Sequence, residues 1–172
     1  MPQRTDIFDL PRLGLTSGEG RRLDLHVHVD PFSYGGQDYR VTSHLVPVRL
    51  DVSRMTGNGW ALRLRFTAGL EGPCVRCLEA ASPEFSVDAR EVEQPGGGEE
   101  LSSPYVDEAA ELDLAAWTRD ALALTLPAKI TCRPDCAGLC AQCGANLNES
   151  PGHAHEREPD QRWAKLGEIR FD

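Results

Sequence analysis

The sequence of 172 residues contains few aromatic side chains and no long apolar run. No window approaches the roughly 18 to 20 consecutive apolar residues that a membrane-spanning helix needs. The opening segment MPQRTDIFDL also lacks the apolar centre of a secretory signal. These absences predict a cytoplasmic protein without a membrane partner.

Recognisable catalytic motifs are missing as well. The sequence has no Gly-rich phosphate loop, no G-x-S-x-G elbow and no H-E-x-x-H motif. It has no internal repeat, and its length suits one main domain with a small extension. We therefore assign no catalytic residue and expect a protein that is not an enzyme.

Positive charge is in short supply, because 18 lysines and arginines face 27 acidic residues and give a net charge of −9. That balance argues against a simple nucleic-acid binder, whose affinity for phosphate comes largely from basic side chains. Residues 71–130 hold 13 acidic against 4 basic residues, which suits solubility or a basic protein partner. An RNA-facing surface remains open in the first third of the chain, where Arg63 and Arg65 alternate with apolar residues.

Alternation of apolar and polar residues predicts most of a β-sheet. The segments VPVRLDV and WALRLRF flank TGNG, whose Asn-Gly pair favours a tight hairpin. Residues 23–29 and the segment EFSVDARE are expected to form further strands. His26 and His28 then fall together on an outer face, where we interpret them as polar surface residues rather than metal ligands.

One amphipathic helix is expected after the acidic segment. Asp113 suits the N-cap, and Pro127 closes the segment. The apolar positions recur at helical spacing: Leu114, Trp117, Ala121 and Leu124. We expect this stripe to pack on the sheet, with Trp117 in the core.

These patterns together predict an α+β fold, a mainly antiparallel β-sheet with one packed amphipathic helix and a C-terminal cysteine-rich zinc loop. We assign residues 1–130 to the sheet and helix, and residues 131–172 to the zinc-binding loop and a C-terminal tail. The acidic, breaker-rich segment near residues 94–108 is expected to be a flexible loop. In the tail, an amphipathic stripe around Trp163 is expected to dock on its own domain.

The six cysteines carry the strongest chemical signal. Cytosolic thiols stay reduced, so clustered cysteines there are more often ligands than disulfides. Four of them lie in the segment CRPDCAGLCAQCG at spacings that suit tetrahedral zinc: Cys132, Cys136, Cys140 and Cys143. We favour this local set, because neighbouring ligands need little loop closure. In the alternative arrangement, Cys74 and Cys77 share the metal with one of the later pairs.

Either arrangement predicts a structural zinc, because four thiolates fill the coordination shell. Gly144, directly after the last cysteine, can adopt the backbone conformation of a metal-binding knuckle. His153 and His155 are close enough in sequence to substitute as ligands, but SPGHAHE is more typical of a solvated linker. The segment CVRC lies between strands and does not open a helix, so thioredoxin-like chemistry is not favoured.

Four motifs follow one another in a recognisable order: CVRCLE, a helical segment ending in LTLPAKI, CAQCG with NLN, and PDQRWAKL. This order resembles the YceD family, the large ribosomal RNA subunit accumulation proteins. Gln161 departs from the family pattern, which usually has proline there. The residues that match the two cysteine motifs are Cys74, Arg76, Cys77, Leu78, Cys132, Cys136, Gly138, Leu139, Cys140, Cys143, Gly144, Asn146 and Leu147.

The resemblance implies a bacterial cytoplasmic protein that supports normal amounts of large-subunit ribosomal RNA. Its implied partner is large-subunit ribosomal RNA or a basic ribosomal protein. Arg76, within the first cysteine motif, joins Arg63 and Arg65 as a candidate RNA or partner surface. The alternative function is a thiol oxidoreductase or an RNA-processing enzyme that uses Cys74 and Cys77.

Overall fold

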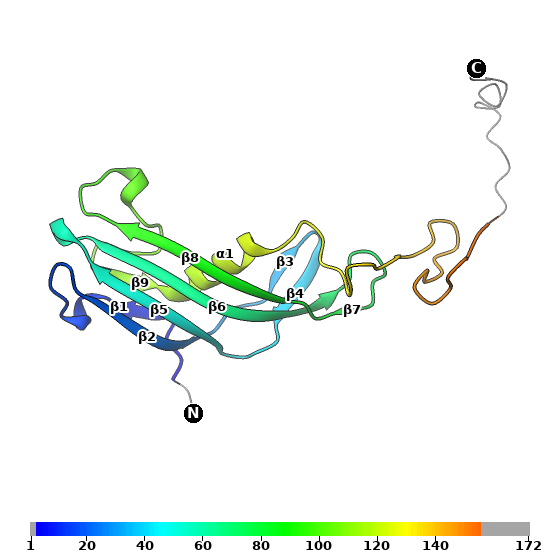
Figure 1. Cartoon of the computed structure of the whole chain (residues 1–172), viewed down its shortest axis with the longest axis horizontal. Helices are drawn as coiled ribbons and strands as arrows, with labels where there is room; N and C mark the ends of the chain where they lie inside the picture. The colour runs from blue at the N-terminus through cyan, green and yellow to red at the C-terminus, as the bar shows by residue number, and fades with distance from the viewer. Residues whose placement is uncertain (1–2, 156–172) are drawn as a thin grey trace, which may run out of the picture. The chain divides into compact units, whose positions relative to one another are not determined.

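The structure, a computed structural model, describes residues 3–155 and is built around a seven-stranded sheet (Figure 1). The strands of this sheet are β2 (Gly20–Val27), β3 (Phe32–Tyr34), β4 (Gln37–Val41), β5 (Val46–Arg54), β6 (Trp60–Pro73), β7 (Ala80–Ala81) and β8 (Glu84–Glu93). The other elements are a two-stranded sheet of β1 (Ile7–Asp9) and β9 (Glu111–Asp113), the helix α1 (Leu114–Thr125), and the 3₁₀ turns η1 (Pro11–Leu13), η2 (Thr56–Asn58) and η3 (Glu99–Leu101). All strand pairs are antiparallel, so the predicted fold class is confirmed.

Strand β6 is the longest and organises the sheet. Its first part lies between β5 and β8, and Leu64 faces Leu50 on one side and Ala89 on the other. Its last residues pair with β4 and β7 instead. The predicted alternation along β6 is confirmed, because Leu62, Leu64 and Phe66 are all buried.

The hairpin between β5 and β6 is wider than a two-residue turn. The N–H of Met55 donates to the carbonyl of Gly59 at 2.8 Å. Gly57 and Asn58 adopt left-handed φ values of 69° and 63°, whereas Gly59 is extended. Asn58 thus contributes its tolerance of the left-handed region, while the glycine after it begins the return to the strand.

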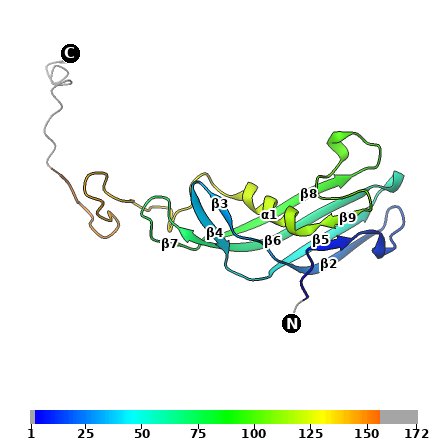
Figure 2. The same cartoon turned by 180° about the vertical axis from the view of Figure 1, so that it is seen from behind.

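Helix α1 covers one face of the main sheet (Figure 2). It starts as the sequence predicts, because the Asp113 carboxylate accepts a hydrogen bond from the N–H of Ala116 at 2.8 Å. It ends before Leu126, whose backbone is extended, because Pro127 disfavours helical backbone in the residue before it.

The buried stripe of α1 differs from the prediction in its last turn. Leu114, Trp117 and Ala121 are buried, as expected. Leu124 is 87% exposed, so its predicted packing on the sheet is wrong. Leu122 is fully buried instead, which shows that the apolar stripe is centred slightly further around the helix.

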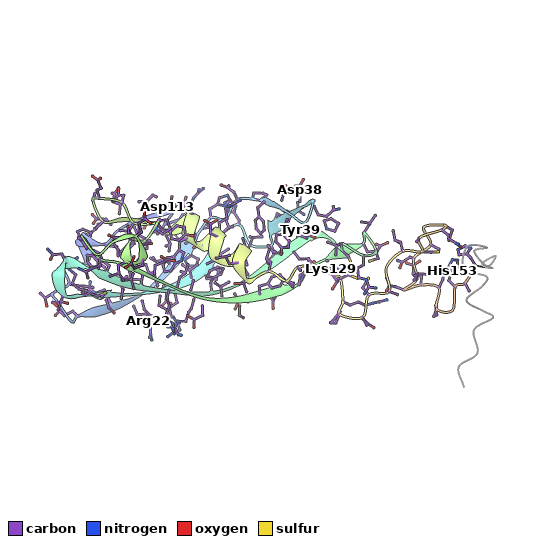
Figure 3. The ribbon with its side chains drawn as sticks, turned by 90° about the horizontal axis from the view of Figure 1, so that it is seen from above. Arg22, Asp38, Tyr39, Asp113, Lys129 and His153 are labelled. Carbon is purple, nitrogen blue, oxygen red and sulfur yellow. The ribbon has the colours of Figure 1, made fainter. Side chains whose placement is uncertain are left out.

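The opposite face of the sheet is polar and charged. Arg22 projects from that face, away from α1 (Figure 3). The alternation of the paired strands places on the same face the arginines Arg22, Arg49, Arg63, Arg65 and Arg90 and the acidic residues Asp24, Asp51, Asp88 and Glu84. Basic and acidic groups therefore nearly balance on this face, within a chain whose net charge is −9.

The chain divides into two compact units, Met1–Cys136 and Ala137–Asp172. Within the first unit, the acidic segment after β8 is hydrogen-bonded, with the N–H of Gln94 donating to Leu101 at 2.7 Å; its flexibility stays a prediction. The tail around Trp163 lies outside the described residues. No helix within residues 3–155 is long and apolar enough to cross a membrane.

Candidate metal sites

The six cysteines fall into two groups of potential ligands, and within each group the ligand atoms lie within 4.8 Å of one another. The first group, the tetrathiolate cluster, consists of Cys74, Cys77, Cys132 and Cys136. The second group, the Cys2His2 cluster, consists of Cys140, Cys143, His153 and His155. The first lies in the first unit of the chain and the second in the second unit.

The tetrathiolate cluster has the dimensions of a zinc site. The Sγ atoms of Cys74 and Cys136 are 3.7 Å apart, and those of Cys77 and Cys132 are 3.6 Å apart. These separations are far longer than a disulfide bond of about 2.05 Å. A tetrahedron of zinc–sulfur bonds of about 2.3 Å has edges of about 3.8 Å, so the four thiols fit a single zinc ion.

The first two thiols belong to a tight loop that directly follows β6, residues 74–79, which we call the first knuckle. The N–H of Leu78 donates to the carbonyl of Cys74 at 2.9 Å, and the N–H of Cys74 donates to Glu79 at 2.7 Å. The N–H of Arg76 points at the Cys74 sulfur from 3.4 Å. Leu78 has a φ of 64°, in the region that favours glycine.

The other two thiols come from the segment that follows α1. The N–H of Val75, inside the first knuckle, donates to the carbonyl of Ile130 at 3.0 Å. Ile130 is itself buried, so it anchors this segment beside the end of β6. The anchor brings Cys132 and Cys136 to the first knuckle, although Cys136 is 62 residues away from Cys74 in the chain.

Electrostatics favour a metal cation at the tetrathiolate cluster. Burial alone would raise the pKa of Cys74, but the N–H groups of Cys77, Cys132 and Arg76 point at its sulfur and lower the pKa to about 6. Burial and hydrogen bonds from the neighbouring thiols raise the pKa of Cys132 to about 12. Close packing of sulfurs thus favours the thiolate at Cys74 and disfavours it at Cys132, and a bound dication would favour the thiolate form of its ligands.

The Cys2His2 cluster begins with a second knuckle, residues 140–145, that has the same hydrogen bonds as the first. The N–H of Gly144 donates to the carbonyl of Cys140 at 2.8 Å, and the N–H of Cys140 donates to Ala145 at 2.8 Å. Gly144 has a φ of 73°. The N–H groups of Cys143 and Gln142 lower the pKa of the Cys140 thiol to about 6.

The structure groups the predicted ligands differently from the favoured sequence interpretation. The local set is divided, with Cys132 and Cys136 beside the first knuckle and Cys140 and Cys143 beside two histidines. The physical reason is that the folded sheet already holds the ends of the long loop together, so sequence distance no longer disfavours the bridging alternative. Metal binding itself stays a prediction.

The two histidines, for which the sequence favours a solvated linker, are exposed or half-buried in the structure and lie beside the second knuckle. Nε2 of His155 lies 3.2 Å from Sγ of Cys140, and Nε2 of His153 lies 3.2 Å from Sγ of Cys143. The signal that could have found them is the H-x-H spacing shortly after a C-x-x-C-G knuckle, because alternate residues of an extended chain point to the same side.

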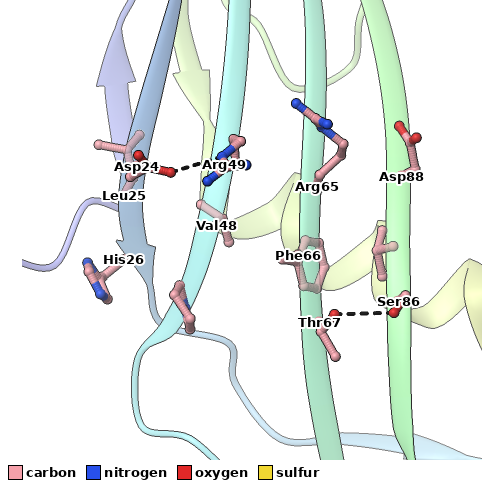
Figure 4. Close-up of a pocket in the computed structure, with 12 residues that line it drawn as sticks. Asp24, Leu25, His26, Val48, Arg49, Arg65, Phe66, Thr67, Ser86 and Asp88 are labelled. Atoms are coloured by element: carbon pink, nitrogen blue, oxygen red, sulfur yellow. Dashed lines mark hydrogen bonds and ion pairs between the residues drawn. The ribbon is translucent and has the colours of Figure 1, made fainter.

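The candidate partner arginines on the open sheet face are held by carboxylates. Arg63 makes two hydrogen bonds to Asp88, at 2.8 and 2.5 Å, and Arg65 contacts Asp51 at 2.6 Å. The hollow on this face is lined by Arg65 and by Arg49, which contacts Asp24 at 3.1 Å (Figure 4). These pairs leave little uncompensated positive charge for phosphate.

Arg76, in the first knuckle, is arranged differently from Arg63 and Arg65. Its side chain is exposed, and none of the ion pairs found among residues 3–155 involves it. The histidines predicted to be polar surface residues show no metal grouping within the described part of the chain. His28 instead contacts the carbonyl of His44 and the carboxylate of Asp30, each at 3.1 Å.

The fold and the two clusters define a class of protein, a small α+β domain whose central strand ends in a cysteine knuckle that can bind a metal. Residues 62–170 match the family described as large ribosomal RNA subunit accumulation protein YceD. The chain therefore belongs to the YceD family, as the sequence motifs predicted. No solved structure matches it.

Several relatives are similar to this chain. A protein of Mycobacterium tuberculosis is 41% identical over 105 residues, which cover 57% of this chain and 49% of the relative. A protein of Mycobacterium leprae is 30% identical over 171 residues, 95% of this chain and 76% of the relative. The chloroplastic large ribosomal RNA subunit accumulation protein YCED homolog 1 of Arabidopsis thaliana is 33% identical over 66 residues, 38% of this chain and 21% of the relative. The chain thus spans about half the length of the M. tuberculosis relative.

Proposed function

We propose that this protein is a non-catalytic factor of the bacterial cytoplasm that supports the accumulation of large-subunit ribosomal RNA during ribosome assembly. Membership of the YceD family supports this role. The observation that carries the non-catalytic part is the tetrathiolate cluster, whose four ligands would fill the shell of a zinc ion. A catalytic zinc keeps a position for water, and this ligand set leaves none.

The zinc in this proposal is structural. It joins the end of β6 to the segment after α1, two segments that the hydrogen bond between Val75 and Ile130 also links. Two fully buried ligands, Cys74 and Cys136, place the ion at the edge of the folded core. Its removal would take away the bonds that hold the four sulfurs together, so we expect the end of the sheet to loosen.

The partner that the charge distribution favours is a basic ribosomal protein of the large subunit. The segment of residues 71–130 carries 13 acidic against 4 basic residues, which suits a strongly basic surface. The charges of Arg63 and Arg65 are compensated by Asp88 and Asp51, which weakens the attraction of these arginines for phosphate. Of the three candidate arginines, Arg76 is the best placed for a phosphate contact, because it is exposed and belongs to none of the ion pairs among residues 3–155.

The test depletes the protein and measures the ratio of large-subunit to small-subunit ribosomal RNA. We expect a selective loss of the large RNA that the intact chain restores. Rescue by Cys74→Ser should fail together with zinc binding at the tetrathiolate cluster, whereas Ser82→Ala, an exposed change close to the same loop, should rescue fully. An unchanged RNA ratio after depletion would overturn the proposal.

The partner is tested with the same purified chain. Binding to a basic large-subunit protein should weaken as salt is raised, and binding to naked ribosomal RNA should be weak and salt-sensitive. RNA binding that stays tight at high salt and is lost in Arg76→Ala would replace the protein partner with an RNA partner.

The alternative function, an oxidoreductase or RNA-processing enzyme, depends on a reactive thiol. The lowered pKa of Cys74 would suit one, but this cysteine is fully buried and faces three other thiols. Cys140 in the second knuckle has the same lowered pKa from the same kind of N–H donors, as expected for paired metal-binding loops. Alkylation of the zinc-loaded chain should therefore reveal no single fast cysteine.

A further inference from the structure

We infer that Cys140, Cys143, His153 and His155 form a second zinc site that supplies the core of residues 137–155. This inference goes beyond the proposed role in ribosomal RNA accumulation and does not depend on it. The sequence interpretation provided for one ion shared among the cysteines, whereas the structure presents two complete and separate sets of four ligands.

The distances between donor atoms suit one small tetrahedral ion. The two sulfur–nitrogen contacts are 3.2 Å each, and the Nε2 atoms of His153 and His155 are 2.9 Å apart. With zinc–sulfur bonds of about 2.3 Å and zinc–nitrogen bonds of about 2.0 to 2.1 Å, the corresponding edges are about 3.5 and 3.3 Å. Outward shifts of a few tenths of an ångström therefore open the cluster to the ion.

The chemistry of the donor set selects zinc. Two thiolates neutralise a dication, and two imidazoles complete a sulfur and nitrogen shell that suits tetrahedral zinc rather than magnesium or calcium. Both histidines offer the same atom, Nε2, which leaves each Nδ1 free to carry the proton that fixes the tautomer. No carboxylate belongs to the group.

The second knuckle supports the inference independently of the histidines. It repeats the backbone hydrogen bonds of the first knuckle, which holds two ligands of the tetrathiolate cluster. Two unrelated segments of one chain thus adopt the same loop, each with a cysteine at its first and fourth positions. In the first loop the N–H of Arg76 points at the first sulfur from 3.4 Å, which is how protein loops stabilise metal-bound thiolates.

Residues 137–155 have almost no apolar core of their own. Gly138 is the one buried residue in this described segment, and Leu139 and Leu147 are half-buried. The segment is closed by a few polar contacts, among them the N–H of Leu147 to Gly138 at 2.9 Å and the N–H of Ala137 to the Asn148 side chain at 2.7 Å. These contacts are too few to offset the conformational entropy that the segment loses when it becomes ordered. Binding of the ion must therefore supply the remaining stabilisation.

The test measures the zinc content of the full chain, purified without chelator. We expect two ions per chain, and one in the double variant His153→Gln, His155→Gln. The matched control, His26→Gln with His44→Gln, alters two histidines outside both clusters and should keep two. One ion in the wild-type chain, or two ions in the His153 and His155 variant, would overturn the inference.

Cobalt substitution and proteolysis keep the result interpretable if a variant folds poorly. The wild-type spectrum should be the sum of a four-sulfur site and a mixed sulfur–nitrogen site, and the mixed component should vanish in the double variant. His155→Cys should keep two ions but shift that component toward the four-sulfur spectrum. Cleavage within residues 137–155 should increase in the double variant while the sheet stays protected; equal loss of protection in both units would contradict the assignment.

Discussion

Substitution of Gly144 would measure how tightly backbone conformation and zinc binding are linked in the second zinc site that we infer. Its φ of 73° lies in the left-handed region, and a Cβ built on it meets no atom within 4 Å. Gly144→Ala therefore adds no steric clash, and its whole cost is that of placing an L-residue in this conformation. That cost is roughly 1 to 2 kcal/mol.

This cost should appear almost entirely in zinc affinity. Residues 137–155 have little apolar burial, so ordering the segment and binding the ion are one event. A cost of roughly 1 to 2 kcal/mol corresponds to a loss of affinity of about 5- to 30-fold, since 1.4 kcal/mol is tenfold. Gly144→Asn should lose less, because asparagine tolerates the left-handed region, and Gly144→Val should lose more.

The assay is a competition titration of the full chain against a zinc-binding dye, with the two sites separated by their affinities. The tetrathiolate cluster should keep its zinc affinity in all three variants, because Gly144 belongs to neither of its two segments. Its own knuckle has Leu78 at the equivalent position and is supported by the sheet core. Equal affinities for the glycine, alanine and valine chains would refute the reasoning. A parallel loss at both sites would show that the substitution acts through the whole fold.

Two further predictions concern the first unit. Asp51→Asn removes the carboxylate shared by Arg22 and Arg65 and should lower the free energy of unfolding by about 1 kcal/mol in urea at pH 7. Burial alone would raise the pKa of Asp51, but hydrogen bonds from the two arginines lower it below its ordinary value. Its contribution is therefore fully present above the unfolded pKa of about 3.9 and is lost as the pH falls from there through the lower folded value, so the gap between the two proteins should begin to close below about pH 3.9; a gap that does not narrow on further acidification contradicts the assignment. Trp117→Ala should cost about 3 to 5 kcal/mol, whereas Leu124→Ala should change the free energy of unfolding by less than about 0.5 kcal/mol, and similar effects of the two would contradict the observed burial.

The elements that could be predicted from the sequence are those whose signals are local. The alternation along β6 and the N-cap at Asp113 depend on neighbouring residues, and both are found as expected. Leu124 shows the limit of periodicity, because it lies at the margin of the apolar stripe and in the last turn of α1, where the sequence does not say how far the packed surface extends.

The grouping of the ligands could not be predicted for a different reason. The sequence argument uses the entropy of loop closure in an unfolded chain, where bringing Cys74 to Cys136 costs more entropy than bringing neighbouring cysteines together. In the folded protein the pairing of β6 with β8 and the contact of Val75 with Ile130 have already brought the segments together. The histidines of the second cluster were visible in the sequence, but their polar surroundings resembled a linker.

In the structural zinc site that we propose, the long connection between the two halves of the tetrathiolate cluster also sets the order in which the ligands become available during synthesis. Cys74 and Cys77 leave the ribosome as a two-ligand loop, which holds zinc weakly. The other two ligands arrive only after β7, β8, β9 and α1 have been made. Because chains emerge from their N-terminus, the ion can acquire all four ligands only after the segment that follows α1 has been made. A chain truncated before Cys136 would therefore lack the fourth ligand.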